Sequence, residues 1–253
     1  MRQGDRARWD RALQPARVSA YAPGEFVGQE SLMTAGEIRA LAGQAGMCPG
    51  VTALDVCCGT AGPGRFLTRE LACTYLGVDA SASAVAVARE RAGDHLSRFA
   101  VGRVPPLPAG PFDVVLLLET MLAFQDKDAL VREIATVLAP GGRFAFTLED
   151  GPPLTAAERG AMPDADTVWL APLERMATSL ERVGLVVTWQ EDHSRAHRAT
   201  AQALEAAFAA DAAGIAAQLG RRALDELLAA HRLWIEWLDA RRVRKLAVVA
   251  ERA

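Results

Sequence analysis

The chain has 253 residues, of which 51% are hydrophobic, and its formal net charge is −3 with a pI of about 5.9. The length suits one α/β domain with an appendage, and the composition allows a sizeable core. The slightly acidic balance excludes an electrostatic basis for nucleic-acid binding.

Cellular setting is indicated by the start of the chain and by the cysteines. Met1–Arg6 lacks an apolar signal core, and no apolar run in the sequence is long enough to span a bilayer. The cysteines have no metal-ligand spacing, and two adjacent ones fall at the end of a buried strand. We therefore expect a cytoplasmic protein with no membrane partner. The cysteines are Cys48, Cys57, Cys58 and Cys73.

The first 45 residues are predicted to form a helical and loop cover, residues 1–45. Tyr21–Glu30 is rich in turn formers yet carries two aromatic side chains. Thr34 and Glu37 have the spacing of a capping box, which predicts a helix that continues to about Ala45. Pro49-Gly50 then turns the chain into the first strand.

The stretch that follows has the pattern of a ligand-binding turn. Val51–Val56 is a short apolar run, as in a buried parallel strand, and Gly59–Gly64 is a glycine-rich turn before a helix at Arg65–Leu71. Bare glycine backbone and free helix N–H groups let a polar ligand approach closely. Asp79 ends the next strand, Thr74–Val78, where an acid commonly holds a ribose hydroxyl.

Strands and helices alternate along the rest of the chain, which predicts a parallel, doubly wound α/β sheet. The domain is expected to span residues 46–193 and 242–253. Residues 194–241 are predicted to form an inserted helical lid of two long helices, Ser194–Ala217 and Arg221–Asp239. The later strands are predicted at Arg98–Val101, Phe112–Leu118, Arg143–Leu148, Leu185–Trp189 and Val243–Ala250.

Three motifs carry a resemblance to the class I S-adenosylmethionine-dependent methyltransferases. Leu54–Thr60 resembles the first motif of that family, although Cys57 and Ala61 stand where it usually has glycines. Phe112-Asp-Val-Val resembles the fourth-strand motif, and Leu138-Ala-Pro-Gly-Gly142 resembles the Leu-Lys-Pro-Gly-Gly turn. The resemblance implies a seven-stranded sheet, mostly parallel with an antiparallel last strand, in a small-molecule enzyme with a helical lid.

The same resemblance implies the cofactor, S-adenosyl-L-methionine, and the residues that bind it. In the family, the residues matching Asp55, Gly59 and Asp79 hold the methionine part and the ribose. The full predicted cofactor-binding set is Asp55, Cys57, Gly59, Thr60, Asp79, Ala80 and Glu119.

Glu119 is the predicted catalytic residue. It follows the buried run Val114–Leu118, so it projects at the mouth of the cofactor cleft. The segment Glu119–Asp126 is similar to a family stretch whose histidine, a base in some members, is replaced here by Ala123. An apolar pocket would raise the carboxyl pKa, as suits a general base. The alternative is that Glu119 positions the cofactor or begins a helix.

Two segments are predicted to meet the substrate. His193, Arg195, His197 and Arg198 form a cationic group suited to an anion, and the alternative is a solvated helix start. The two histidines share a helix face, but no third ligand is evident, so no metal is predicted. Tyr21, Phe26 and Gln29 lie in the loop of the cover, where Tyr21 could shield the sulfonium or simply pack.

The predicted function is methyl transfer to a small, anionic and partly apolar metabolite. The most specific hypothesis is C-methylation of an isoprenyl diphosphate, and the alternative is N- or O-methylation of an amino acid or a specialised metabolite. A dinucleotide-dependent oxidoreductase and a non-catalytic binding protein remain further alternatives. The expected partner is a small molecule, and the chain is expected to be a monomer or homodimer.

Overall fold

The computed structural model describes residues 6–93 and 95–253. Residues 1–5, part of the segment predicted to lack a signal core, lie outside the described residues. Within the described ranges, none of the helices combines the length and the apolar character needed to cross a membrane.

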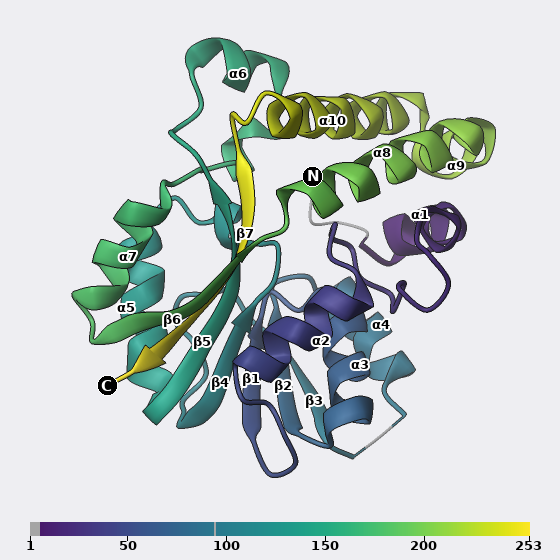
Figure 1. The fold of residues 1–253 in the computed structure, drawn as a ribbon. Helices are drawn as coiled ribbons and strands as arrows, with labels where there is room; N and C mark the ends of the chain where they lie inside the picture. The colour runs from purple at the N-terminus through teal and green to yellow at the C-terminus, as the bar shows by residue number, and fades with distance from the viewer. Residues whose placement is uncertain (1–5, 94) are drawn as a thin grey trace.

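A seven-stranded sheet forms the centre of the molecule (Figure 1). Its strand order is β3-β2-β1-β4-β5-β7-β6, and β7 runs antiparallel to both β5 and β6 while the other pairs are parallel. The predicted fold class is thereby confirmed. The strands are β1 (Thr52–Val56), β2 (Thr74–Asp79), β3 (Ser97–Val101), β4 (Phe112–Leu117), β5 (Leu138–Asp150), β6 (Leu185–Asp192) and β7 (Arg244–Arg252).

Helices cover both faces of the sheet, because its strands are apolar on both sides. On one face, Leu130 and Ile134 of α5 (Lys127–Val137) and Leu180 of α7 (Leu173–Glu181) belong to the largest core cluster. The other face is covered by α2 (Ala35–Gln44), α3 (Gly62–Leu71) and α4 (Ala82–Arg91) (Figure 1). Short elements connect these layers: α6 (Ala156–Ala161), η2 (Met121–Ala123) and η3 (Ala165–Thr167).

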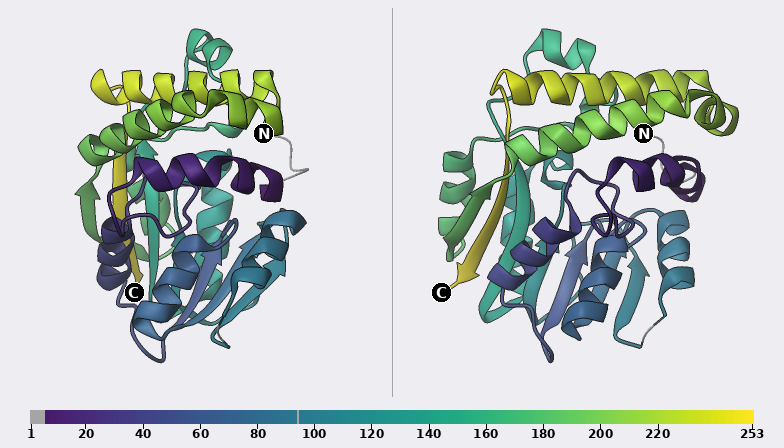
Figure 2. Two further views of the ribbon diagram at one scale, coloured as in Figure 1. Left: turned by 90° about the vertical axis from the view of Figure 1, so that its right-hand side faces the viewer. Right: turned by 45° about the vertical axis from the view of Figure 1, so that its right-hand side comes forward.

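A second layer of helices lies beyond the carboxyl ends of the central strands (Figure 2). It contains α8 (Ser194–Ala210), α9 (Ala212–Leu219) and α10 (Arg221–Asp239). The prediction of two lid helices is wrong, because the chain breaks at Asp211 and α9 begins there as a separate helix. This break lets Ile215 of α9 enter the same apolar cluster as Leu204 of α8.

The helix α1 (Arg6–Ala20) joins this lid layer, although its sequence is basic and weakly patterned. Leu13 and Ala16 of α1 are buried against Phe208 of α8 and Leu224 of α10. Figure 2 shows α1 lying beneath the lid helices, between them and the sheet domain. The predicted boundary between an N-terminal cover and a lid therefore divides a set of helices that share one core.

Local signals mark several element boundaries correctly. The predicted capping box of Thr34 and Glu37 forms at α2, and Thr155 and Glu158 form a second capping box at α6. The segment 139–142 is a bulge within β5, because Phe112 pairs with Leu138 and the register then shifts so that Val114 pairs with Arg143.

Candidate active site

A cavity of about 180 Å³ lies at the carboxyl ends of β1, β2 and β4. The glycine turn forms its floor, and Gly28, Glu30 and Ser31 of the cover loop close it from above. Among the predicted cofactor-binding residues, Ala80 does not line the cavity, because it follows Asp79 on an exposed turn. The other six do line it: Asp55, Cys57, Gly59, Thr60, Asp79 and Glu119.

Asp79 ties the ends of the first two strands together. Its Oδ2 accepts the N–H of Gly59 at 3.0 Å, and its Oδ1 accepts the N–H of Ser81 at 2.8 Å. Each carboxylate oxygen has a further lone pair, so Asp79 can still accept hydrogen bonds from the hydroxyls of a ribose. A Cβ placed on Gly59 would have no atom within 4 Å, which leaves room there for a ligand.

Close packing in this turn depends on Gly62 and Gly64, which come after the two positions, Cys57 and Ala61, where the family usually has glycines. A Cβ on Gly62 would lie 2.3 Å from the carbonyl of Gly28, so the cover loop rests directly on the turn. A Cβ on Gly64 would lie 2.1 Å from the ring of Tyr75. Cys57 and Ala61, which replace the usual glycines, both adopt left-handed backbone with φ of 63° and 57°.

Asp55 is buried at the end of β1, where the hydroxyl of Tyr75 donates a 2.5 Å hydrogen bond to its Oδ2. Burial raises the pKa of Asp55 to about 7, even though the Tyr75 hydroxyl stabilises the carboxylate. The charge of Asp79 adds to the increase.

A second cavity, of about 290 Å³, lies between the sheet and the lid layer. Its wall is mostly apolar and includes Trp9 and Leu13 of α1, Phe208 of α8 and Trp234 of α10. Polar groups come from Arg6, Arg17, Tyr21, Glu30, Ser31, Glu119, Glu149, His231 and Lys245. A cavity whose exposed wall is mostly apolar, with polar groups to orient a ligand, suits a small organic molecule.

The two cavities meet at Glu119. Glu119, Arg6, Glu30 and Ser31 line both of them, and Glu119 is the one that projects from the end of the central strand β4. Its backbone is left-handed, with φ of 54°, and its N–H donates a 2.5 Å hydrogen bond to Thr147 Oγ1. A left-handed non-glycine residue costs backbone energy, which commonly marks a functional position.

The environment of Glu119 is charged, whereas the sequence predicts an apolar pocket. Lys245 Nζ lies 2.9 Å from Glu119 Oε2, and His197 Nδ1 lies 3.7 Å from Oε1. Burial alone would raise the pKa of Glu119, but Lys245 and His197 outweigh it and lower that pKa below its usual range. The expectation of a raised pKa is wrong, because the strand β7 places an ammonium against the carboxylate.

Lys245 is shared between two buried acids. Its Nζ lies 2.6 Å from Glu149 Oε1 and 5.4 Å from the centre of the Trp234 ring. Burial by itself would lower the pKa of Lys245, but the charges of Glu119 and Glu149 raise it above its usual value. Lys245 therefore stays charged at neutral pH and holds Glu119 in place.

The three predicted loop residues differ in position. Tyr21 lines the larger cavity and donates its hydroxyl to the carbonyl of Ser31. Phe26 packs against Tyr21 with ring centres 5.5 Å apart. Gln29 does not reach either cavity, because its amide binds the backbone of Val27, Glu25 and Met33 within the loop.

The predicted cationic group does not form. His193 and His197 are buried against carboxylates, whereas Arg195 is exposed and Arg198 pairs with Asp239, with Nη2 and Oδ2 3.0 Å apart. The i,i+4 spacing brings the two histidines together, but residues 195 and 198 of the same helix point elsewhere. None of these four residues lines either of the two described cavities.

Sequence reasoning missed several residues of the site. Arg17, Glu149, His231 and Lys245 line the larger cavity. His231 donates its Nδ1–H to the Leu227 carbonyl at 2.8 Å, and burial lowers its pKa. The one sequence signal for Glu149 and Lys245 is an ionisable residue within an otherwise apolar strand pattern.

Comparison with known proteins agrees with this geometry. A family model described as "Methyltransferase domain" matches residues 54–146, which contain the glycine turn, Asp79 and Glu119. The protein "Methyltransferase GfsG" of Streptomyces halstedii is 31% identical over 169 residues, covering 61% of this chain and 60% of that protein. The match therefore spans about three fifths of the length of this relative.

Solved structures share the fold over almost the whole chain. The mycolic acid cyclopropane synthase CmaA1, complexed with SAH and CTAB, has a TM-score of 0.81 at 13% identity and covers 98% of both chains. The [4+2]-cyclase SpnF has a TM-score of 0.76 at 24% identity, covering 99% of this chain and 96% of its own. At these identities the likeness concerns the fold alone.

The matched domain and the motif at its centre indicate the class of the protein. Residues 54–146 are similar to a methyltransferase domain, which supports a class I S-adenosylmethionine-dependent methyltransferase with S-adenosylmethionine as its cofactor. The residues present fit this cofactor, because Gly59 leaves open space and Asp79 has free acceptor positions at a strand end where ribose hydroxyls commonly bind.

Proposed function

We propose that this protein transfers the methyl group of S-adenosylmethionine to a small acceptor with an apolar body and an acidic group. The observation that carries the proposal is that the two cavities meet at Glu119. The bound cofactor supplies an electrophilic methyl group, so the protein must align the acceptor with it and exclude water.

The wall of the larger cavity supports an apolar acceptor. Trp9, Phe208 and Trp234 come from three helices and surround the space next to Glu119. Leu32 of the cover loop also lines this cavity, and its N–H lies 3.4 Å from Glu119 Oε2. A wall of this kind excludes water from the transfer path.

Arg17 supports an acidic group on the acceptor. Among the described cations of the cavity wall, Arg6 pairs with Glu30 and Lys245 pairs with Glu119, which leaves Arg17 for the ligand. A single guanidinium suits a carboxylate or phenolate. Because the predicted His and Arg group is not assembled, we favour such an acceptor over the isoprenyl diphosphate of the initial hypothesis.

Glu119 is the group that would take a proton from the acceptor. Its Oε1 is buried and has no hydrogen-bond partner among residues 6–93 and 95–253. Its lowered pKa makes it a weak base, which matches a carboxylic acid, or a phenol whose pKa the neighbouring Arg17 guanidinium would lower. Arg17 attracts an anionic acceptor and repels an ammonium, so methylation of an acidic acceptor is favoured over N-methylation.

The test is transfer of labelled methyl from S-adenosylmethionine to four acceptors: a prenylated phenol, a medium-chain fatty acid, geranyl diphosphate and an apolar amine. We expect label in the phenol or the fatty acid. Glu119→Gln should lower kcat roughly 10²- to 10⁴-fold and leave the affinity for S-adenosylhomocysteine little changed. The matched control is Glu174→Gln, which removes an exposed carboxylate on α7.

Arg17→Ala tests the acidic end of the acceptor separately. It should raise KM for the acceptor about tenfold or more and leave kcat largely unchanged, because uniform binding is lost. Binding of S-adenosylhomocysteine with no transfer to any acceptor would reject the proposal. It would then favour another reaction on the same fold, as the cyclase neighbour illustrates.

A further inference from the structure

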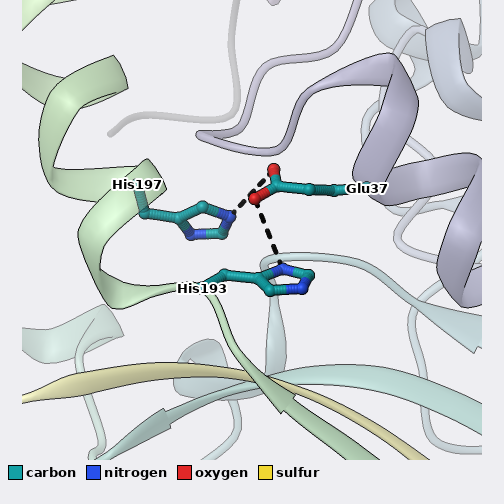
Figure 3. Close-up of side chains that lie close together, drawn as sticks. All are labelled: Glu37, His193 and His197. Atoms are coloured by element: carbon teal, nitrogen blue, oxygen red, sulfur yellow. Dashed lines mark ion pairs between the residues drawn. The ribbon is translucent and has the colours of Figure 1, made fainter.

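Three side chains that can ligate a metal ion meet beside Glu119, and His197 Nδ1 lies 3.7 Å from Glu119 Oε1. Glu37 comes from the first turn of α2, His193 from the end of β6, and His197 from the first turn of α8. Figure 3 shows the carboxylate of Glu37 facing both imidazole rings. The sequence shows no third ligand near the histidine pair, and Glu37, 156 positions before His193, supplies one in the folded chain.

The distances within this group match those between the ligands of one metal ion. Glu37 Oε1 lies 3.5 Å from His193 Nδ1, and Glu37 Oε2 lies 3.4 Å from His197 Nε2. Two ligands at the usual zinc distance of about 2.05 Å are separated by about 3.3 Å in a tetrahedral site. All three ligand atoms lie within 4.8 Å of one another, so a shift of about 1.5 Å or less completes the geometry.

The ligand atoms of the histidines are buried without a hydrogen-bond partner. His193 Nδ1 and His197 Nε2, which face Glu37, make no hydrogen bond to any of the described residues. Both rings are almost fully buried, His197 to the point of 1% exposure. Leaving buried polar atoms unpaired costs free energy, and a metal ion would satisfy both of them.

A carboxylate lies near the outer nitrogen of each histidine ring, and a backbone N–H binds the Glu37 carboxylate. His193 Nε2 faces Glu191 at 3.4 Å, and His197 Nδ1 faces Glu119 at 3.7 Å. The backbone N–H of Thr34 donates to Glu37 Oε2 at 2.8 Å. Carboxylates behind the ligating histidines fix the ring orientation and raise ligand basicity.

Charge balance points in the same direction. Three largely buried carboxylates, those of Glu37, Glu119 and Glu149, accompany one ammonium, that of Lys245. If the two imidazole ligands are neutral, two negative charges remain, and one divalent cation would neutralise them. Two imidazole nitrogens and one carboxylate suit zinc, whereas magnesium prefers oxygen ligands alone.

We propose that Glu37, His193 and His197 bind one divalent transition-metal ion of the zinc type. The ion joins α2 of the cover to the junction of β6 and α8, where the lid begins. It also orients His197 so that its Nδ1–H points at Glu119 Oε1. The site thereby has a structural and positioning role, and it does not depend on which acceptor the protein methylates.

The experiment is metal titration of the full chain after removal of metal with a chelator. We expect one Zn²⁺ per chain by calorimetry, with no binding of Mg²⁺ under the same conditions. At a zinc concentration about 100 times Kd, the midpoint of thermal unfolding should rise by about 5–10 °C. Co²⁺ in place of Zn²⁺ should give the visible absorption of a four-coordinate site, which added zinc removes.

Two variants and one control complete the test. Glu37→Gln keeps the oxygen that accepts the Thr34 N–H but should weaken zinc binding at least tenfold, and the double variant His193→Ala/His197→Ala should abolish it. His95→Ala removes an exposed histidine elsewhere and should bind zinc as the wild type does. No zinc binding by the wild type, zinc binding retained by the double variant, or a preference for Mg²⁺ would overturn the proposal. If the double variant does not fold, the cobalt spectrum of the wild type decides.

Discussion

The two cavities that share Glu119 are assembled in different ways. The wall of the smaller cavity, where we propose that the cofactor binds, comes mainly from residues 55–63 and from the residues that end β2 and β4, and Arg6 and the cover loop complete it. The larger cavity, where we propose that the acceptor binds, is lined by side chains from Arg6 on α1 to Lys245 on β7. The cover loop and the helices α8 and α10 also contribute to its wall. The smaller cavity depends mainly on residues that are close together in the sequence, whereas the larger cavity exists only after the lid layer has packed.

This difference predicts how each region responds to substitution. Changes in the glycine turn should act on cofactor affinity, because the turn lines the smaller cavity, where we propose that the cofactor binds. Changes in the Lys245 cluster should act first on stability, because its charges are buried where the lid meets the sheet. Glu119 belongs to both regions, so its substitution should affect catalysis and also stability, because it leaves the buried ammonium of Lys245 with one carboxylate fewer.

The largest effect is expected for Lys245→Met. It leaves Glu119 and Glu149 buried without their cation, which should lower the free energy of unfolding by about 3–5 kcal/mol. The measurement is denaturant unfolding at pH 7. Arg244→Met is the matched control, since Arg244 is half exposed in its pair with Asp150 and should cost about 1 kcal/mol or less. Equal losses in the two variants would contradict the buried-charge interpretation.

The second effect is a pH dependence of stability from Asp55. Its pKa rises from 3.8 in the unfolded chain to about 7 in the folded one, so the folded state binds more protons between these values. Stability should therefore fall as pH rises from about 4 to about 7 and level off above, by roughly 1–4 kcal/mol.

Asp55→Asn is the variant that isolates this term, because the amide oxygen can still accept from Tyr75 and cannot ionise. The difference between wild type and variant in denaturant unfolding should grow in favour of the variant from pH 4.5 to pH 7.5. A difference that stays constant over this range would remove Asp55 as the cause.

A smaller effect is expected for Gly62→Ala, which forces the cover loop away from the glycine turn. The added Cβ would meet the Gly28 carbonyl at 2.3 Å, and overpacking of this kind costs about 1–3 kcal/mol. We expect weaker binding of S-adenosylhomocysteine by calorimetry. Gly160→Ala, in open space on α6, is the control and should leave that affinity unchanged.

The smallest effect is expected for Tyr21→Phe, which removes the hydroxyl that donates to the Ser31 carbonyl. Loss of one part-buried hydrogen bond should cost about 0.5–1.5 kcal/mol in denaturant unfolding. The affinity for S-adenosylhomocysteine should stay near that of the wild type, since Tyr21 lines the larger cavity and not the smaller one. A large loss of cofactor affinity would show that the ring also covers the cofactor.

Much of the fold could be predicted because its signals are local. Buried parallel strands appear as continuous apolar runs, and the capping boxes at Thr34 and Thr155 are patterns of four residues. The helix α1 escaped prediction, since a helix that packs into a shared apolar cluster needs few apolar residues of its own. The break at Asp211 escaped as well, because an alanine-rich run has no strong stop signal.

By itself, the sequence determined most of the wall of the smaller cavity. Asp55, Gly59 and Asp79 lie at or just after strand ends that must meet in any parallel sheet of this order, so their proximity follows from the chain pattern. The tertiary structure alone decided the partners of Glu119 and the grouping of Glu37 with His193 and His197. The contacts of Glu119 with Lys245 and of Glu37 with His193 join segments far apart in the chain, and they depend on how α2, α8 and β7 pack, which no local pattern specifies.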